Sequence, residues 1–186
     1  MIQPLRLLPF LLLAIAPRIY SGAVLSPDER TLTLVTPKGQ TLAPKTQPDQ
    51  VGFTSAQLSA DHRLAGWLTL VPNCCTSYPI PSTLVIMKNG KVVQKFREEL
   101  AIFHWAFSAD GATVAYQGST VHGCAATFYR LRRVSDGEIL ATFECNCESG
   151  GARLPVPDWV WPVASECPRP LSGDPSQIDP TARSQK

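Results

Sequence analysis

Six cysteines and one histidine are the residues of this chain whose types and spacing could support chemistry. The cysteines are Cys74, Cys75, Cys124, Cys145, Cys147 and Cys167. His122-x-Cys124 and Cys145-x-Cys147 together offer one imidazole and three thiolates, a set that zinc or cuprous copper accepts. One hypothesis is therefore a metal-handling or thiol-dependent protein that uses these four residues.

Disulfide bonds are the competing interpretation, and the sequence favours them. Both pairs lack the wider gap that zinc knuckles use, and an even number of cysteines in an exported chain is typical of a disulfide framework. We expect at least two disulfides, but the spacing does not choose their pairing. A bond between the neighbours Cys74 and Cys75 is strained, so we expect separate partners, with a bridge from one of them to Cys124, Cys145 or Cys147.

Motifs for catalysis are absent from the sequence. It contains no G-x-S-x-G, H-E-x-x-H, P-loop, C-x-x-C or C-x-x-C-H pattern. Glu98 and Glu99 are interpreted as a solvated connecting turn, and Asp61 and Asp110 as residues that bond to their own turns. We therefore expect no catalytic residues, no cofactor and no enzymatic activity.

The charge balance does not indicate a nucleic-acid partner. Seventeen basic and fifteen acidic residues give a net charge of +2, and the basic residues form no stripe that could neutralise a phosphate backbone. We expect a protein or small-molecule ligand instead, and oligomerisation is left open.

The N-terminus has the pattern of a signal peptide. Arg6 precedes the apolar run Leu7–Ala16, which is shorter than the roughly 20 residues of a membrane-spanning helix. We predict cleavage after Ala23, a periplasmic or secreted protein, and no membrane span after cleavage. A single domain is then expected at 24–167. The tail, 168–186, is poor in apolar residues and is predicted to be disordered.

Repeated turn signatures predict the fold. Hairpin signatures recur at Gly39, Gly90 and Gly137, and Ser-Ala-Asp turns ending at Asp61 and Asp110 precede the last two. The two aspartates are 49 residues apart and the last two glycines 47, so both landmarks report one period. Alternating apolar and polar residues around these turns indicate an N-terminal hairpin and two antiparallel four-stranded units. Trp67, Trp105, Phe107 and Tyr116 fall at core positions.

The segments LSADHRLAGWLTL (58–70) and FSADGATVAYQG (107–118) resemble the strand, turn, strand core of WD-type and TolB-like β-propeller repeats. The resemblance covers roughly residues 53–143 and implies sheets with blade topology. Propellers need at least four blades to close, so we expect an all-β protein with two propeller-like sheets and an N-terminal hairpin, not a closed propeller.

Blade topology would also gather the cysteines. In an up, down, up, down blade, the loop after the second strand and the exit of the fourth lie at one end, so Cys74, Cys75, Cys124, Cys145 and Cys147 would share a rim with His122. Tyr78, a loop aromatic beside Pro79, is a candidate contact residue on this rim.

The combination of NCCTSYPIP (73–81), VHG (121–123) and YRLRRVSDGEIL (129–140) also resembles a group of exported bacterial proteins of unknown function. That resemblance implies no activity. The sequence as a whole favours an exported, non-enzymatic binding or scaffold module that uses the rim.

Overall fold

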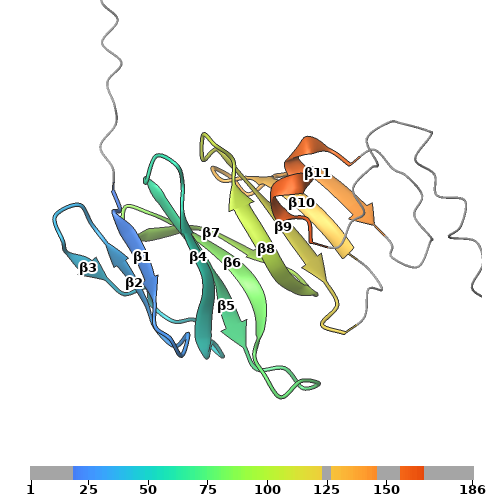
Figure 1. Ribbon diagram of the computed structural model, residues 1–186, viewed down its shortest axis with the longest axis horizontal. Coiled ribbons are helices and arrows are strands. Elements are labelled where there is room, and N and C mark those ends of the chain that lie inside the picture. The colour runs from blue at the N-terminus through green and yellow to red at the C-terminus, as the bar shows by residue number, and fades with distance from the viewer. Residues whose placement is uncertain (1–18, 123–126, 146–155, 166–186) are drawn as a thin grey trace, which may run out of the picture.

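Three antiparallel sheets stand side by side in chain order (Figure 1). The computed structural model describes residues 19–122, 127–145 and 156–165, and the predicted disordered tail lies outside these ranges. Sheet A contains β1 (Gly22–Leu25), β2 (Leu32–Val35) and β3 (Thr41–Leu42). Sheet B contains β4 (Gly52–Leu58), β5 (Leu64–Val71), β6 (Ile80–Lys88) and β7 (Lys91–Arg97). Sheet C contains β8 (Ala101–Phe107), β9 (Thr113–Ser119), β10 (Thr127–Arg133) and β11 (Ile139–Cys145).

Sheets B and C have the predicted blade topology. Within each, neighbouring strands follow one another in sequence and pair antiparallel, in the orders β4-β5-β6-β7 and β8-β9-β10-β11. No sheet closes on itself, which confirms the expected all-β fold of open sheets. Among the described residues, no helix is long and apolar enough to span a membrane.

The same side-chain turn joins the first and second strands of all three sheets. In each, a serine Oγ donates to an aspartate Oδ1 at 2.6 Å and accepts a backbone N–H at 3.0 Å from the residue five positions after the serine. The pairs are Ser26–Asp28, Ser59–Asp61 and Ser108–Asp110. The first of them was not predicted. Sheet A is therefore a third repeat and not only a hairpin.

Comparison of the three sheets shows that the three hairpin glycines do not occupy equivalent turns. Gly39, Gly90 and Gly137 all have positive φ, at 75°, 72° and 79°, as their turns require. However, the turn at Gly39 joins the second and third strands of sheet A, whereas the other two join the third and fourth strands of sheets B and C. Sheet A thus lacks the fourth strand that its neighbours have.

Apolar layers hold the sheets together face to face. Sheets A and B share a core around Tyr20, Leu32, Leu34, Phe53, Ala65, Trp67, Val85 and Met87. Sheets B and C share a core around Leu64, Leu68, Leu84, Ile86, Phe96, Ile102, Trp105, Val114, Tyr116 and Val134, with Phe107 packed against it. The aromatic residues predicted as core therefore lie in or against these layers.

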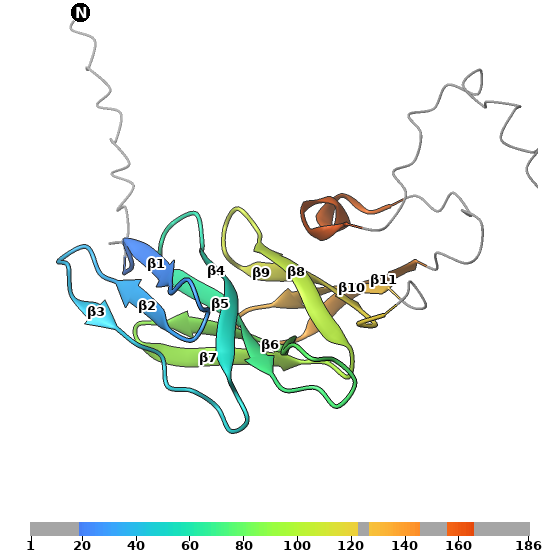
Figure 2. The ribbon, with the colours of Figure 1, turned by 60° about the horizontal axis from the view of Figure 1, so that its bottom comes forward.

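A short 3₁₀ helix, η2 (Asp158–Val163), covers the outer face of sheet C, as Figure 2 shows beyond β8–β11. Val160 and Val163 are buried against Ala115 and Tyr129. Trp159 packs against the same cluster, so this segment caps a core. The helix packs on the part of this face formed by β8 and β9.

Trp105 fixes the approach of sheet C to sheet B. Its indole Nε1 donates to the carbonyl oxygen of Ser55 at 2.9 Å, and its own carbonyl accepts from Gln57 Nε2 at 3.0 Å. The ring packs on Gly66 so closely that a Cβ at that position would lie 2.5 Å from the ring atom Cη2. The two sheets can approach this closely only because β5 carries a glycine there.

We expect Gly66→Ala to destabilise the protein by roughly 1–3 kcal/mol, because the buried indole has no room to move away. Gly22→Ala is the matched control, since its Cβ would meet nothing closer than 3.9 Å. Urea unfolding monitored by tryptophan fluorescence measures both. Equal midpoints for the two variants would contradict this packing of Trp105.

The described fold begins before the predicted cleavage point. Tyr20 is 1% exposed, and its hydroxyl accepts the backbone N–H of Gly90 at 3.0 Å. The N–H groups of Ile19 and Tyr20 donate to the carbonyl of His62 at 3.0 Å. The boundary after Ala23 falls inside β1. Cleavage there would divide a strand and remove a buried aromatic side chain.

A chain that starts at Pro17 is therefore expected to be more stable than one that starts at Val24. The loss of a buried aromatic residue alone costs about 3 kcal/mol, and burial raises the pKa of the Tyr20 hydroxyl. Chemical denaturation of the two purified chains measures the difference. Indistinguishable midpoints would show that residues 17–23 contribute nothing to sheet A.

Candidate functional site: the cysteine rim

One end of sheets B and C carries the loops in which the cysteines were predicted to gather. At this end β5 leads into β6, β7 into β8 and β9 into β10, and β11 ends. We call the loop 72–79, residues 119–122 and Cys145 the cysteine rim. In Figure 1, loop 72–79 projects below β5 at the bottom of the molecule. The strand directions therefore place Cys74, Cys75, His122 and Cys145 at one end, as blade topology predicted.

The predicted bridge from Cys74 or Cys75 across the rim is absent. Both are exposed free cysteines, and their Sγ atoms lie 2.7 Å apart in a hydrogen bond to each other. The two thiols contact each other, and not sheet C, because they occupy the turn of a projecting loop. A hydrogen bond to Cys74 and the charge of that neighbour raise the pKa of the Cys75 thiol.

The other residues of the predicted metal set are only partly described. His122 is exposed, and Cys145 at the end of β11 is not a free thiol. Cys124, Cys147 and Cys167 lie outside the described residues. Within the described ranges, no three His, Cys, Asp or Glu side chains come together as a metal-binding group. Further disulfides remain a prediction.

Tyr78 presents an aromatic surface on the same rim. Its side chain is 53% exposed, and its carbonyl accepts the Thr76 hydroxyl at 2.6 Å. A hydrogen bond within the loop therefore restrains the backbone at Tyr78, while the ring stays exposed to solvent. A residue that contacts a partner must be exposed in this way.

Beside the loop lies a pocket of about 370 Å³. Its walls come from the connection before β4 and from the rim ends of β5, β6 and β7, and its lining includes Gln47, Pro48, Asp49, Gln50, Thr69, Pro72, Ser82, Thr83 and Arg97. The side-chain amide of Gln50 already forms hydrogen bonds within the protein. Its oxygen accepts the backbone N–H of Gln47, and its nitrogen donates to the carbonyl of Gly52. Among the described residues, neither Arg97 nor Asp49 has an ion-pair partner, so the pocket offers one charge of each sign to a ligand. Sequence reasoning gave no signal for it, because its walls come from four separate segments.

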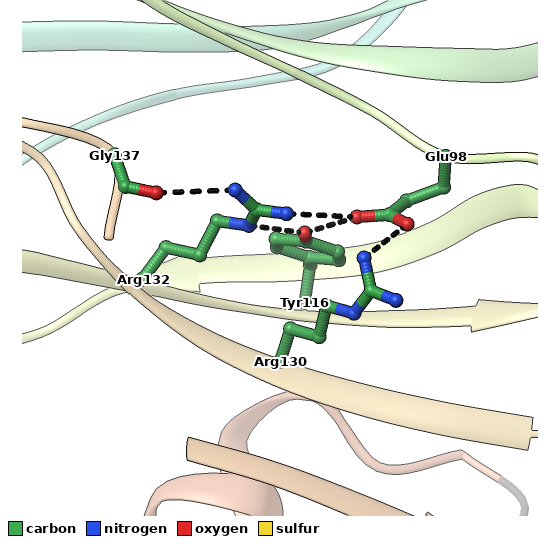
Figure 3. Close-up of polar contacts among 5 residues, drawn as sticks. All are labelled: Glu98, Tyr116, Arg130, Arg132 and Gly137. Carbon is green, nitrogen blue, oxygen red and sulfur yellow. Dashed lines mark hydrogen bonds and ion pairs between the residues drawn. The ribbon is translucent and has the colours of Figure 1, made fainter. Parts of the chain in front are cut away.

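Next to Arg97 the structure contradicts the prediction of a solvated turn. The Glu98 side chain is only 7% exposed and forms ion pairs with Arg130 and Arg132 of β10. As Figure 3 shows, it also accepts the Tyr116 hydroxyl at 2.5 Å, and Arg132 Nε donates to that hydroxyl at 2.8 Å. The carboxylate is buried because the connection from β7 to β8 passes over the face of β9 and β10. We call these four residues the Glu98 cluster.

Aromatic rings and a carbonyl complete this cluster. The guanidinium groups of Arg130 and Arg132 lie 4.9 Å and 5.1 Å from the ring centroids of Phe128 and Phe96. Arg132 also donates to the carbonyl of Gly137 at 3.1 Å. Burial and the hydrogen bond to Glu98 raise the pKa of Tyr116 far above its usual value, so its hydroxyl keeps its proton. The cluster ties sheet B to sheet C and holds the chain next to Arg97.

The opposite end of the sheets carries a second pocket, of about 490 Å³, between the turns of Asp61 and Asp110. Both carboxylates accept hydrogen bonds from their own turns, as predicted, and these bonds lower the pKa of each. These aspartates are therefore structural parts of the turns.

Fold and site together define an all-β protein of three stacked antiparallel sheets, two with blade topology, with a pocket and a cysteine loop on one rim. No family model matches the chain, and no curated protein matches it.

Solved structures offer remote likenesses. The chain is similar to hydrazine synthase of Kuenenia stuttgartiensis, with 13% identity and a TM-score of 0.48 over 67% of this chain and 34% of that one. It is also similar to the β-propeller domain of Cps50 (Swd1) of Myceliophteria thermophila, with 19% identity and a TM-score of 0.36 over 69% of this chain and 48% of that one. The chain spans about a third and about half of their lengths.

We expect Glu98→Gln to destabilise the protein by about 2 kcal/mol, because it leaves two arginines without their carboxylate. The value stays below that of a fully buried pair because the side chains of Arg130 and Arg132 are 29% and 18% exposed. The adjacent exposed Glu99→Gln is the control and should change stability by less than about 0.5 kcal/mol. Thermal unfolding compares the two, and equal effects would contradict the role of the cluster.

Proposed function

We propose that this protein is an exported, non-catalytic binding or scaffold module that holds a polar segment of a protein partner on the cysteine rim. The observation that carries the proposal is the rim pocket of about 370 Å³, whose lining includes Pro72 of the loop that also carries the exposed Tyr78. A polar pocket and an exposed aromatic side chain on one surface are a combination that protein interfaces favour.

The charges of the pocket indicate what it would bind. Arg97 can donate to a carboxylate or a backbone carbonyl, and Asp49 can accept from an amide or an ammonium group. Ser82 and Thr83 of β6 also line the pocket, and their hydroxyl oxygens lie 3.3 Å apart. A peptide segment carries all of these groups, whereas a purely apolar ligand would leave both charges unpaired.

The hydrogen bonds of the buried Glu98 carboxylate support a non-catalytic role. Both oxygens of Glu98 are occupied by Arg130, Arg132 and Tyr116, so none is available to exchange a proton with a substrate. The residues that line the pocket include no histidine and no cysteine.

Export is supported by the sequence. The apolar run Leu7–Ala16 after Arg6 has the length of a signal sequence. Sheet A begins at Gly22, and the contacts of Ile19 and Tyr20 lie after this run. A cleavage position before Ile19 is therefore part of the proposal, in place of the position after Ala23.

Site-specific photocrosslinking in the producing cell tests this function. With p-benzoylphenylalanine at position 78, we expect one discrete crosslinked protein, and Arg97→Glu in the same chain should reduce its yield at least fivefold. The control carries the crosslinker in place of Val24, which is 57% exposed on sheet A and far from the rim in sequence. The same adduct from both positions, or a yield that Arg97→Glu leaves unchanged, would exclude the rim as the binding site.

A further inference from the structure

A pocket of about 430 Å³ lies between sheet B and the segment 42–48, which leads out of β3. We call it the β7 pocket, because β7 forms its outer side. Gln47 and Pro48 line both this pocket and the rim pocket, so the two are neighbours, but their other lining residues differ. The proposed partner site on the rim does not use the β7 pocket.

Strand pairing explains why this part of sheet B is open. Val85 and Met87 of β6 are buried in the layer that sheets A and B share. On β7, Lys95 pairs with Val85 and Val92 pairs with Met87, and directly paired residues have their side chains on the same face. Val92 is nevertheless 44% exposed. The layer between the sheets therefore ends before β7, and the face of this strand is left uncovered.

The inner wall of the β7 pocket is apolar. It includes the buried side chains of Trp67, Val85 and Met87, and Pro44 of the facing segment is also buried. Small-molecule sites have volumes of about 300–1,000 Å³ and are lined mainly by apolar and aromatic side chains. The size and the wall therefore favour a small ligand with an apolar body.

The charged side chains around the β7 pocket all have one sign. Lys45 lines it from the segment after β3 and Lys95 from β7, and no aspartate or glutamate is among its lining residues. Within the described ranges, neither lysine has an ion-pair partner. An anionic group in the pocket would meet two ammonium groups and no repelling carboxylate.

The wall also contains a hydrogen-bond donor without a partner. Trp67 is 2% exposed and lines the pocket. In the part of the chain that the structure describes, no acceptor bonds to its indole N–H, whereas the indole of Trp105 donates to the carbonyl of Ser55. Buried tryptophans usually pair this group. A ligand that brings an oxygen atom into the pocket offers such an acceptor.

We propose that the β7 pocket binds a small organic carboxylate with an apolar body, of which octanoate is the example. The apolar body packs against Trp67 and Met87, and the carboxylate interacts with Lys45 and Lys95. A neutral apolar ligand would leave both lysines unpaired, and a cationic ligand would be repelled by them. This site is distinct from the polar peptide site proposed for the rim.

Isothermal titration calorimetry of the full chain with sodium octanoate tests the site. We expect one equivalent to bind, and octanol, which has the same apolar body without the charge, to bind at least tenfold more weakly. Lys45→Gln and Lys95→Gln should each weaken octanoate binding at least threefold. Lys91→Gln is the matched control, because Lys91 is exposed on the same strand but does not line the pocket. It should bind octanoate as the parent chain does.

Quenching of tryptophan fluorescence by 8-bromooctanoate locates the bound ligand. We expect saturable quenching that Trp67→Phe removes and that Trp105→Phe retains, since Trp105 does not line the pocket. Val92→Asp covers the case in which a tryptophan variant does not fold. This change is made at a partly exposed side chain and places a carboxylate in the wall, so it should reduce octanoate binding at least tenfold while circular dichroism stays unchanged.

Three results would overturn the proposal: equal affinities for octanol and octanoate, parent-like binding by both lysine variants, or equal weakening by Lys91→Gln. Absence of octanoate binding, together with a loss of the Tyr78 crosslink in the Val92→Asp chain, would assign the pocket to the protein partner and would also overturn it. Octanoate binding in a chain that gives no specific crosslink would leave this site standing while the proposed rim function fails.

Discussion

The apolar faces shared between neighbouring sheets are the constraint on which the rest of this structure depends. None of the three sheets closes on itself, so each must bury a face against the next. Trp67 lies in the layer between sheets A and B, and Trp105 in the layer between sheets B and C. The close approach of Trp105 to Gly66 sets the separation of the second pair of sheets. The Glu98 cluster then holds the connection between the two sheets with ion pairs to β10.

This stacking explains why the cysteine rim is a defined surface. Loops at one end of two sheets keep a fixed relation only if the sheets do not slide. Glu98 holds the connection between β7 and β8, and the preceding residue, Arg97, is thereby placed in the wall of the rim pocket. Tyr78 and the two thiols stand on a loop with its own internal hydrogen bonds. The rim therefore combines a fixed pocket with an exposed aromatic and an exposed dithiol.

Local features were predictable from the sequence, and contacts between distant segments were not. Asn89-Gly90 and the turn at Gly137 were identified because their chemistry lies within a few residues. Glu98 was misjudged because its partners lie 18 to 34 residues later, on β9 and β10. Strand β1 was missed because Tyr20 and its neighbours follow an apolar run that resembles a signal sequence. The free state of Cys74 depends on where a loop projects, which no spacing pattern encodes.

Native-state amide hydrogen exchange tests the central claim that the three sheets support one another. The central strands β2, β5 and β9 belong to different sheets, yet their buried faces belong to shared layers. The account predicts that the slowest amides of all three exchange through one common opening, with equal free energies that fall together with added denaturant. Separate opening of sheet A, with β5 and β9 still protected at the full free energy of unfolding, would contradict it.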